Sequence, residues 1–573
     1  MINLGVRTGA EIMWEVLQRE GVEVVFGYPG GAIMPAYDAM LKYTIRHVLV
    51  RHEQGAAHMA DGYARASGRV GVALATSGPG ATNLVTGIAT AMLDSVPIVC
   101  ITGQVSSKVI GSDAFQETDI TGVTLPITKH NYLVTRAQDI APMLRQAFYV
   151  ARSGRPGPVL VDITKDAQQA SVDFEWDGGP VRLPGYRPEH RVRAEDVRAA
   201  VDMIDHAERP ILFCGHGIIA AEAGGLLREF VDKTGIPVAS TLLGLGGFPA
   251  THPLCLGMMG MHGEAWVNHA IQESDLIIAM GMRFDDRVTG KLETYARRAK
   301  KIHCELDPAE INKNVRVDVP IVGDVAETLG ALIPAVTPRD HHSWLARIHE
   351  LKGDSAVRDI QTMPRTDRLF AAHVMHDLWR ITQGKALVVT DVGQHQMWEA
   401  QYYKHDFPRK LITSGGLGTM GFALPAAIGA KLACPEEEVW VIVGDGGFQM
   451  TAAELSTCAQ EGIKIHVAVI NNGFLGMVRQ WQQFFYGGRY AATPMRGPDF
   501  VKLAEAHGLG GLRVTSRDQV EDVVAAARAA KETVVIDFRV EQEDSVYPMV
   551  AAGADLHDMI RRPSPIVETA ADE

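Results

Sequence analysis

Residues 439–472, VWVIVGDGGFQMTAAELSTCAQEGIKIHVAVINN, decide the fold of this chain. The apolar runs Val439–Val443 and Ile465–Ile470 predict two buried strands, and Thr451–Gln460 between them predicts a helix. A strand, helix and strand in this order form a right-handed crossover with parallel strands. The stretch is therefore expected to be one βαβ unit of a doubly wound sheet.

The same alternation of apolar runs and helical segments extends through the rest of the chain. Further strands are predicted at Val22–Phe26, His47–Val50, Val70–Thr76, Ile98–Thr102, Val159–Ile163, Ile211–Cys214, Leu276–Met280, Lys301–Leu306, Ala386–Thr390 and Val534–Phe538. We expect an α/β protein with three doubly wound parallel-sheet domains, over residues 8–168, 192–335 and 368–545. The stretches 168–191 and 337–367, rich in charge, Gly or Pro, are expected to connect them.

Composition excludes several classes of partner. The 573 residues carry 68 acidic and 55 basic side chains, a net charge of −13, so nucleic acid is not an expected partner. The six cysteines are scattered singly, which favours a reducing compartment. No run reaches membrane-spanning length and the N-terminus does not resemble a signal segment, so a cytoplasmic location is expected.

Two polar residues follow the strands of the opening stretch. Asp445 and Asn472 come at the carboxyl ends of parallel strands, where open sheets bind ligands. One carboxylate and one amide oxygen suit Mg²⁺, and the neighbouring glycines let backbone N–H groups approach phosphates. A lone Gly-Asp-Gly is more often a hairpin turn, but Asn-Asn across a strand-helix-strand unit favours a Mg²⁺–diphosphate site.

This pattern resembles the thiamine-diphosphate-binding fold. The resemblance implies that Asp445, Asn472 and the backbone oxygen of Phe474 bind the Mg²⁺. It also implies that Met420 wedges between the rings of the cofactor, although a methionine here could equally be core, and His395 a buried polar residue. The implied cofactor-binding set, besides Glu53 below, is Val392, Gly393, Gln394, His395, Gly418, Met420, Gly444, Gly446, Gly447, Asn472 and Gly476.

A second carboxylate is implied in the first domain. Thiamine enzymes use a glutamate beside the pyrimidine N1′ to drive deprotonation of the thiazolium C2. Residues 51–65, RHEQGAAHMADGYAR, resemble the family's glutamate segment and assign that role to Glu53. By itself, a glutamate at a helix start more often only complements the helix dipole.

From Thr8 to about Gly553 the chain resembles the catalytic large subunit of acetohydroxyacid (acetolactate) synthases. FGYPGGAIMP (26–35), TSGPGATN (76–83) and GSDAFQE (111–117) carry the resemblance. It implies Gln116 and Lys165 as catalytic residues beside Glu53, and Trp481 as the residue that favours 2-ketobutyrate as acceptor. Lys165 and Arg287 could equally be solvated surface charges. The implied substrate-pocket residues are Gly31, Ala32, Phe115, Arg287, Met477 and Trp481.

The middle domain resembles the FAD-binding segments of these synthases. LGMMGMHGEAW (256–266), DLIIAMGMRFDDRVTG (275–290) and ELDPAEINKN (305–314) carry this likeness, which implies a flavin without a net redox role. A Gly-x-Gly such as 215–217 is by itself more often an ordinary turn. The implied FAD-binding residues are Arg155, Gly215, Gly217, His262, Gly263, Gly281, Met282, Arg283, Glu305, Asp307 and Asp324.

The resemblance implies an acetolactate synthase. Such an enzyme decarboxylates pyruvate and joins the hydroxyethyl unit to a second pyruvate, giving 2-acetolactate, or to 2-ketobutyrate, giving 2-aceto-2-hydroxybutyrate. This is the first common step of branched-chain amino-acid biosynthesis. The family completes each site between subunits, so a homodimer or tetramer is expected, with a small regulatory subunit as a further candidate partner. The alternatives are a pyruvate oxidase or decarboxylase and an inactive binding subunit.

The chain departs from the family at two places. Gly446-Gly447 replaces an Ala-Ser pair, which should loosen that loop without removing the metal ligand. Ser106 stands where many relatives carry a proline that lines the herbicide channel. The resemblance therefore predicts reduced sulfonylurea sensitivity with catalysis intact.

Overall fold

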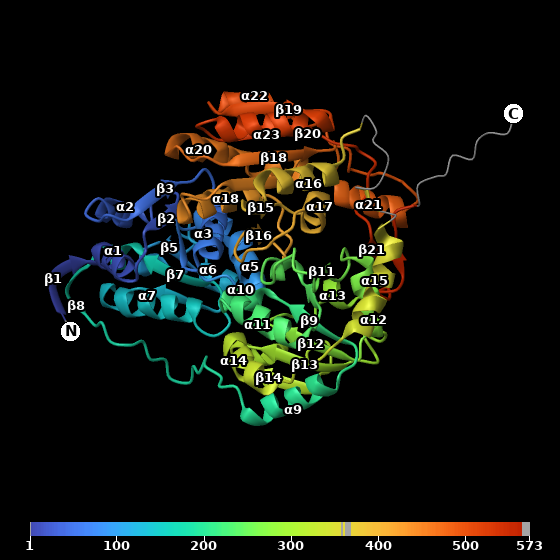
Figure 1. The fold of residues 1–573 in the computed structure, drawn as a ribbon. Helices are drawn as coiled ribbons and strands as arrows, with labels where there is room; N and C mark the ends of the chain where they lie inside the picture. The colour runs from blue at the N-terminus through green and yellow to red at the C-terminus, as the bar shows by residue number, and fades with distance from the viewer. Residues whose placement is uncertain (1, 357–358, 361–367, 564–573) are drawn as a thin grey trace.

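The computed structural model describes residues 2–356, 359–360 and 368–563. Three parallel sheets of six strands each follow one another along the chain, with helices on both faces (Figure 1). The predicted α/β class with three doubly wound sheets is confirmed.

The N-terminal sheet has the order β3-β2-β4-β5-β7-β6. In chain order within this sheet, that is 2-1-3-4-6-5. The predicted strands are all present, whereas the edge strand β6 was not predicted because its sequence, HNYLV, is half polar. The strands are β2 (Val24–Gly27), β3 (Arg46–Leu49), β4 (Gly71–Ala75), β5 (Ile98–Gln104), β6 (His130–Val134) and β7 (Val159–Thr164).

The middle sheet has a different order, β11-β10-β9-β12-β13-β14, or 3-2-1-4-5-6 in chain order. This is the strand order of dinucleotide-binding folds, in which the ligand lies where the order reverses, here between β9 and β12. The strands are β9 (Pro210–Cys214), β10 (Val238–Ser240), β11 (Cys255–Met258), β12 (Leu276–Met280), β13 (Lys300–Glu305) and β14 (Val319–Val322).

The C-terminal sheet, β16-β15-β17-β18-β20-β19, repeats the 2-1-3-4-6-5 order of the N-terminal sheet. The strands are β15 (Leu387–Thr390), β16 (Leu411–Thr413), β17 (Val439–Gly444), β18 (His466–Asn471), β19 (Gly510–Val514) and β20 (Val534–Arg539). The single helix predicted at 451–460 is wrong in detail. The crossover is helical from Asp445 and divides into α19 (Asp445–Thr451), η6 (Ala452–Glu454) and α20 (Leu455–Glu461).

The first and third domains pack on each other through α3 (Glu53–Ser67) and α18 (Ala423–Ala433) (Figure 1). The two helices approach at glycines: a Cβ on Gly62 would lie 2.0 Å from the Ala426 oxygen, and one on Gly429 1.9 Å from the Met59 oxygen. Because any side chain at these positions would separate the helices, the glycines set the contact between the two domains.

The connecting segments contain some regular structure. Ser171–Trp176, in the first expected connection, form β8, which pairs antiparallel with β1 (Ile2–Thr8). The second connection is helical over α15 (His342–Ala356), and residues 357–358 and 361–367 of it lie outside the described part. Within the residues that the structure describes, no helix is both long and apolar enough to cross a membrane.

Candidate active site

Asp445 and Asn472 lie side by side at the carboxyl edge of the C-terminal sheet. β17 and β18 are parallel neighbours, with Gly444 opposite Ile470, so each of the two polar residues follows directly after its strand. Asp445 is 3% exposed and Asn472 6% exposed. The sequence prediction that the two residues meet at one sheet edge is confirmed.

Asp445 is a buried carboxylate without a cationic partner among the described residues. Burial raises its pKa to about 6, and the backbone N–H groups of Asp445, Gly446 and Gly473 only partly offset that cost. A buried carboxylate of this kind is stabilised by a bound cation. The described residues contain no group of three or more His, Cys, Asp or Glu side chains that could hold a metal ion, so a cation here would also depend on amide and carbonyl oxygens, as Mg²⁺ can.

Asn472 is held by a chain of side-chain amides. Its Oδ1 accepts the Phe474 N–H at 3.0 Å, and its Nδ2 donates to Gln394 Oε1 at 3.2 Å. Gln394 in turn donates to Gln480 Oε1 at 2.9 Å. A Cβ on Gly476 would lie 2.2 Å from Gln394 Oε1 and 2.7 Å from Asn472 Nδ2, so a larger residue there would displace this amide chain. The predicted residues Gln394, Asn472, Phe474 and Gly476 are therefore neighbours.

His395 lies between the β15 and β17 ends. It is buried, which lowers its pKa to about 3 and keeps the ring neutral at pH 7. Its Nε2 accepts the Gly444 N–H at 3.3 Å. A Cβ on Gly444 or on Gly393 would lie 2.9 Å from the ring. Gly393 also has φ 153°, a conformation that favours glycine. The two glycines thus let the imidazole pack against the strand ends.

The loop expected to be loosened by Gly446 and Gly447 is instead tightly packed helix. A Cβ on Gly446 would lie 2.8 Å from Leu475 Cδ2, and one on Gly447 2.3 Å from Asp391 Oδ1. Asp391 is fully buried and accepts the N–H groups of Val392, Gly421 and Ala423, which ties the residues before Gly393 to those after Met420. The expectation of a loose loop was wrong, because the missing side chains make room for neighbouring atoms.

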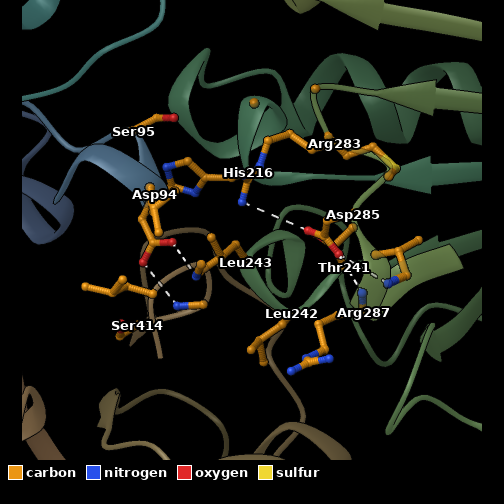
Figure 2. Close-up of a pocket in the computed structure, with 18 of the residues that line it drawn as sticks. Asp94, Ser95, His216, Thr241, Leu242, Leu243, Arg283, Asp285, Arg287 and Ser414 are labelled. Carbon is orange, nitrogen blue, oxygen red and sulfur yellow. Dashed lines mark hydrogen bonds and ion pairs between the residues drawn. The ribbon is translucent and has the colours of Figure 1, made fainter. Parts of the chain in front are cut away.

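A cavity of about 930 Å³ opens between the three domains (Figure 2). It has the size of a cofactor pocket. Of the residues predicted for thiamine diphosphate, FAD and substrate, those that line it are Arg155, Gly217, His262, Gly281, Met282, Arg283, Arg287, Glu305, Asp324, Val392, Gly393, Gly418, Met420, Met477 and Trp481.

The charged groups of this cavity come mainly from the middle domain. Burial raises the pKa of Glu305 to about 7, although the Leu306 and Asp307 N–H groups bind its carboxylate. Burial also lowers the pKa of His262 to about 4. Arg287 lines the cavity but its side chain is 59% exposed and pairs with Asp286 at 3.0 Å, so its position is compatible with either interpretation of the residue.

Three of the predicted FAD residues do not line the cavity. Gly215 packs on the β12 end, where a Cβ would lie 2.2 Å from the Gly281 oxygen, and Gly263 packs in the same manner on Met259. Asp307 instead pairs with Arg155, 3.3 Å from Nη1 to Oδ2, beside Glu310 at 3.0 Å. The two glycines therefore pack behind the residues that line the cavity, and Asp307 holds Arg155, which does line it.

The predicted residues of the N-terminal domain gather at a separate place. Glu53 is 8% exposed at the start of α3, and its Oε2 accepts the Asn83 amide at 2.9 Å. A Cβ on Gly80 would lie 3.2 Å from Glu53 Oε1, so the 77–78 loop and the start of α4 (Pro79–Asn83) run over the carboxylate. The cavity-lining residues do not include Glu53, Gln116 or Lys165.

The remaining N-terminal residues surround that loop. A Cβ on Gly78 would lie 2.8 Å from the Gln116 oxygen, and Gln116 has φ 60°, a left-handed conformation that non-glycine residues adopt at some cost. The Ala32 N–H, next to Gly31, donates to Thr76 Oγ1 at 3.3 Å. Phe115 is 88% exposed. Lys165 begins α8 (Lys165–Gln169), beyond the end of β7.

Several cavity residues were missed by sequence reasoning. Asp94, Ser95, His216 and Thr241 line the cavity, and His216 has a pKa lowered to about 4 by burial and by the charge of Arg65 (Figure 2). Gly215-His-Gly217 was the one available signal for His216. Asp94 belongs to no sequence motif. It reaches the cavity only because separate domains pack together there.

Comparisons with known proteins agree with this geometry. Models of thiamine pyrophosphate enzymes match over residues 7–123 (N-terminal TPP binding domain), 197–332 (central domain) and 391–538 (C-terminal TPP binding domain). They define the class: a thiamine-diphosphate-dependent enzyme of three domains.

Curated relatives narrow the class. The chain is 52% identical over 562 residues to the acetolactate synthase of Mycobacterium bovis, covering 95% of this chain and 90% of that protein. It is 50% identical over 564 residues to the acetolactate synthase large subunit of Corynebacterium glutamicum, covering 96% and 90%. The large subunit of Haemophilus influenzae is 45% identical over 563 residues, covering 96% and 98%. The chain belongs to the acetolactate synthase family, whose typical cofactors are thiamine diphosphate, Mg²⁺ and FAD.

Proposed function

We propose that this chain decarboxylates pyruvate and joins the remaining two-carbon unit to a second 2-ketoacid, with pyruvate giving 2-acetolactate and 2-ketobutyrate giving 2-aceto-2-hydroxybutyrate. The observation that carries this proposal is a pair of buried acids, Glu53 at the edge of one sheet and Asp445 beside Asn472 at the edge of another sheet of the same strand order. Thiamine diphosphate, when bound, supplies the group that accepts the electron pair released as CO₂ leaves.

The residues of the chain would divide the work as follows. Asp445, Asn472 and the Phe474 carbonyl would hold Mg²⁺ and through it the diphosphate. Glu53, held by Asn83, would keep a proton on the pyrimidine ring nitrogen. Met420, Met477 and Trp481 would exclude water, since they give the cavity three bulky apolar walls. Gln116 and Lys165 are proposed at the same reaction site from the N-terminal side.

FAD is proposed for the middle-domain part of the cavity. Gly217 and Gly281 meet there, with the Gly217 N–H donating to the Gly281 oxygen at 2.9 Å, at the point where the strand order reverses. Arg155 from the N-terminal domain and Arg283 from the middle domain supply positive charge on the cavity wall for a pyrophosphate.

A homodimer is the proposed active unit. Glu53 does not line the cavity of its own chain, and the N-terminal loops expose apolar side chains, Phe115 (88%), Leu125 (68%) and Met34 (50%), that a second copy would cover. A tetramer, and a small partner subunit by analogy with relatives named as large subunits, are extensions of this proposal. The six free cysteines support the cytoplasm as its location.

Subunit mixing tests the shared site. At a Mg²⁺ concentration that just saturates the wild-type enzyme, Glu53→Gln and Asp445→Asn chains are each expected to be nearly inactive. Exchange between them would form hybrid dimers that hold one intact site, so roughly a quarter of the wild-type rate is expected to return. A mixture that stays inactive while mass measurements detect hybrids would place both residues in a site within one chain.

A product assay tests the activity itself. The purified chain would receive pyruvate, thiamine diphosphate, Mg²⁺ and FAD, with 2-ketobutyrate as competing acceptor. Acetolactate that gives way to acetohydroxybutyrate is the expected result. Acetate or acetaldehyde as the main product would contradict the proposed reaction.

A further inference from the structure

The loop that carries Met420 has no regular structure of its own. Residues 414–420, SGGLGTM, follow β16 and form one wall of the cavity; we call them the glycine loop. Gly416, Leu417 and Gly418 are exposed, and Gly418 has φ 69°. A segment of this composition keeps a single conformation only where other groups bind its backbone.

One of those groups is a carboxylate of the N-terminal domain. Asp94 is the last residue of α5 (Val85–Asp94) and is 2% exposed. Its Oδ1 accepts the Gly416 N–H at 2.7 Å and its Oδ2 accepts the Gly415 N–H at 3.1 Å (Figure 2). The carboxylate therefore binds two consecutive N–H groups at the start of the loop, from a different domain.

The position of Asp94 is unfavourable for its own helix. An acid at the last residue opposes the helix dipole, which favours cations at that end. Arg65 compensates for the charge: its Nη2 lies 2.9 Å from Asp94 Oδ2, and its Nη1 donates to the Thr413 oxygen at 2.9 Å. Arg65 also pairs with Asp61 at 2.5 Å, so two acids share one buried arginine.

A second contact from α5 supports the same arrangement. Thr419 directly precedes Met420, and its hydroxyl lies 2.7 Å from the hydroxyl of Thr90. A Cβ on Gly416 would lie 2.9 Å from Asp94 Oδ1, which accounts for glycine at that position. The glycine loop is thus bound at its start by Asp94 and near its end by Thr90.

We propose that Asp94 is a positioning residue that holds the glycine loop from the N-terminal domain, so that the place of Met420 in the cofactor site depends on contact between two domains. The inference rests on the proposed function in one respect, the contact of Met420 with thiamine diphosphate. The geometry of the loop itself does not depend on that contact.

Asp61 provides a matched control. It is fully buried and shares Arg65, yet it makes no hydrogen bond to the glycine loop. Asp61→Asn and Asp94→Asn therefore remove the same charge from the same cluster, and only the second disturbs the loop. A loss of stability alone would appear in both variants.

The test measures backbone hydrogen exchange of peptides covering 414–420 in the full-length enzyme, and the KM for thiamine diphosphate against kcat. Asp94→Asn is expected to speed exchange in the loop and to raise this KM about tenfold with a smaller effect on kcat, while Asp61→Asn changes neither. Thr90→Val is expected to act in the same direction, more weakly, and serves if Asp94→Asn does not fold.

Equal exchange and equal KM in the two Asn variants would overturn the proposal. If the wild-type chain made no acetolactate, the proposed function would fail, but faster loop exchange in Asp94→Asn alone would still support the positioning role. Unchanged exchange in both Asp94→Asn and Thr90→Val would refute that role whatever the activity.

Discussion

In the N-terminal sheet the second strand, β3, leads to Glu53, whereas in the C-terminal sheet the third and fourth strands, β17 and β18, lead to Asp445 and Asn472. Both sheets have the strand order 2-1-3-4-6-5. The common topology therefore fixes only the edge at which ligands bind, and the residue after each strand determines the chemistry at that edge.

The surroundings of the two acids sharpen this contrast. Glu53 has a side-chain amide as partner, that of Asn83. Among the described residues Asp445 has only backbone N–H groups as partners, and burial raises its pKa to about 6. A carboxyl held by one neutral donor is suited to moving a proton, and an unpaired buried carboxylate to binding a cation. In the proposed enzyme the two domains would thus supply different halves of one reaction site.

The largest effect is expected from Glu53→Gln. The variant keeps the size of the side chain but cannot accept and return a proton, so kcat should fall about 10²–10⁴-fold. Steady-state acetolactate formation with saturating cofactors measures the loss. Glu195→Gln, an exposed acid in the first turn of α9 (Ala194–His206), is the control for a helix-dipole effect. A Glu53→Gln rate within twofold of wild type would contradict the proton-transfer role.

Asp445→Asn should act on the cation instead. Removing the only carboxylate of the proposed ligand set is expected to raise the Mg²⁺ concentration needed for half-maximal activity by about 100-fold. A Mg²⁺ titration at fixed thiamine diphosphate measures the change. If Glu53→Gln showed the same Mg²⁺ dependence as Asp445→Asn, the assignment of separate roles to the two domains would be wrong.

The central strands of all three sheets could be predicted from sequence, because they are continuous apolar runs bounded by glycine or polar residues. The short strands β10 (VAS) and β16 (LIT) have three residues each, too few for a period to be recognised. Helix α19 was missed because Gly446 and Gly447 predict a turn, whereas packing against Leu475 and Asp391 overrides that preference.

Some residues of the candidate site could likewise be predicted from sequence, and others could not. Asp445 and Asn472 could be paired from sequence because neighbouring parallel strands bring their ends together. Asp94 and His216 could not, because their functional positions arise where separate domains meet, and no local pattern encodes that contact. The sequence thus indicates residues placed by one βαβ unit better than those placed by the packing of domains.

Trp481→Leu tests the selection of the acceptor 2-ketoacid, in which neither Glu53 nor Asp445 is proposed to take part. Trp481 lines the cavity from α21 (Gly476–Phe485), and the proposed contact between its ring and the extra methyl of 2-ketobutyrate would be worth about 1 kcal/mol. The ratio of acetohydroxybutyrate to acetolactate should therefore fall up to about tenfold, with kcat for pyruvate alone much less affected. Tyr486→Leu, at the C-terminal end of the same helix and 57% exposed, is the control. An unchanged ratio would remove Trp481 from acceptor selection.

Glu305→Gln extends the comparison to the middle domain. Burial raises the pKa of Glu305 from 4.5 to about 7, so the charged form is disfavoured in the folded chain. Its contribution to stability is greatest below pH 4.5 and is lost as the pH rises to about 7. The Tm of Glu305→Gln, relative to wild type without added flavin, should therefore increase between pH 5.5 and 7.5.

Glu310→Gln is the matched control for that measurement. Hydrogen bonds and ion pairs with Lys313 and Arg155 lower the pKa of Glu310 despite the opposing effect of burial. Its carboxylate contributes stability above the unfolded pKa, so its Gln variant should have a lower Tm than wild type at neutral pH. Parallel pH profiles for the two variants would contradict the assigned electrostatics.

The smallest effect is expected at Ser106, where the resemblance led us to expect a proline in many relatives. Ser106 has φ −56°, which proline can adopt, and in the part of the chain that the structure describes its N–H donates to no other group. Ser106→Pro should therefore leave kcat unchanged and raise stability by about 0.4–1 kcal/mol, since it restricts the unfolded chain. Thermal unfolding and sulfonylurea inhibition curves check it: the variant is expected to bind the inhibitor more tightly. An inhibition curve identical to that of wild type would mean that serine at this position does not determine herbicide sensitivity, whereas a fall in Tm would mean that the 105–109 turn has a conformation that proline does not fit.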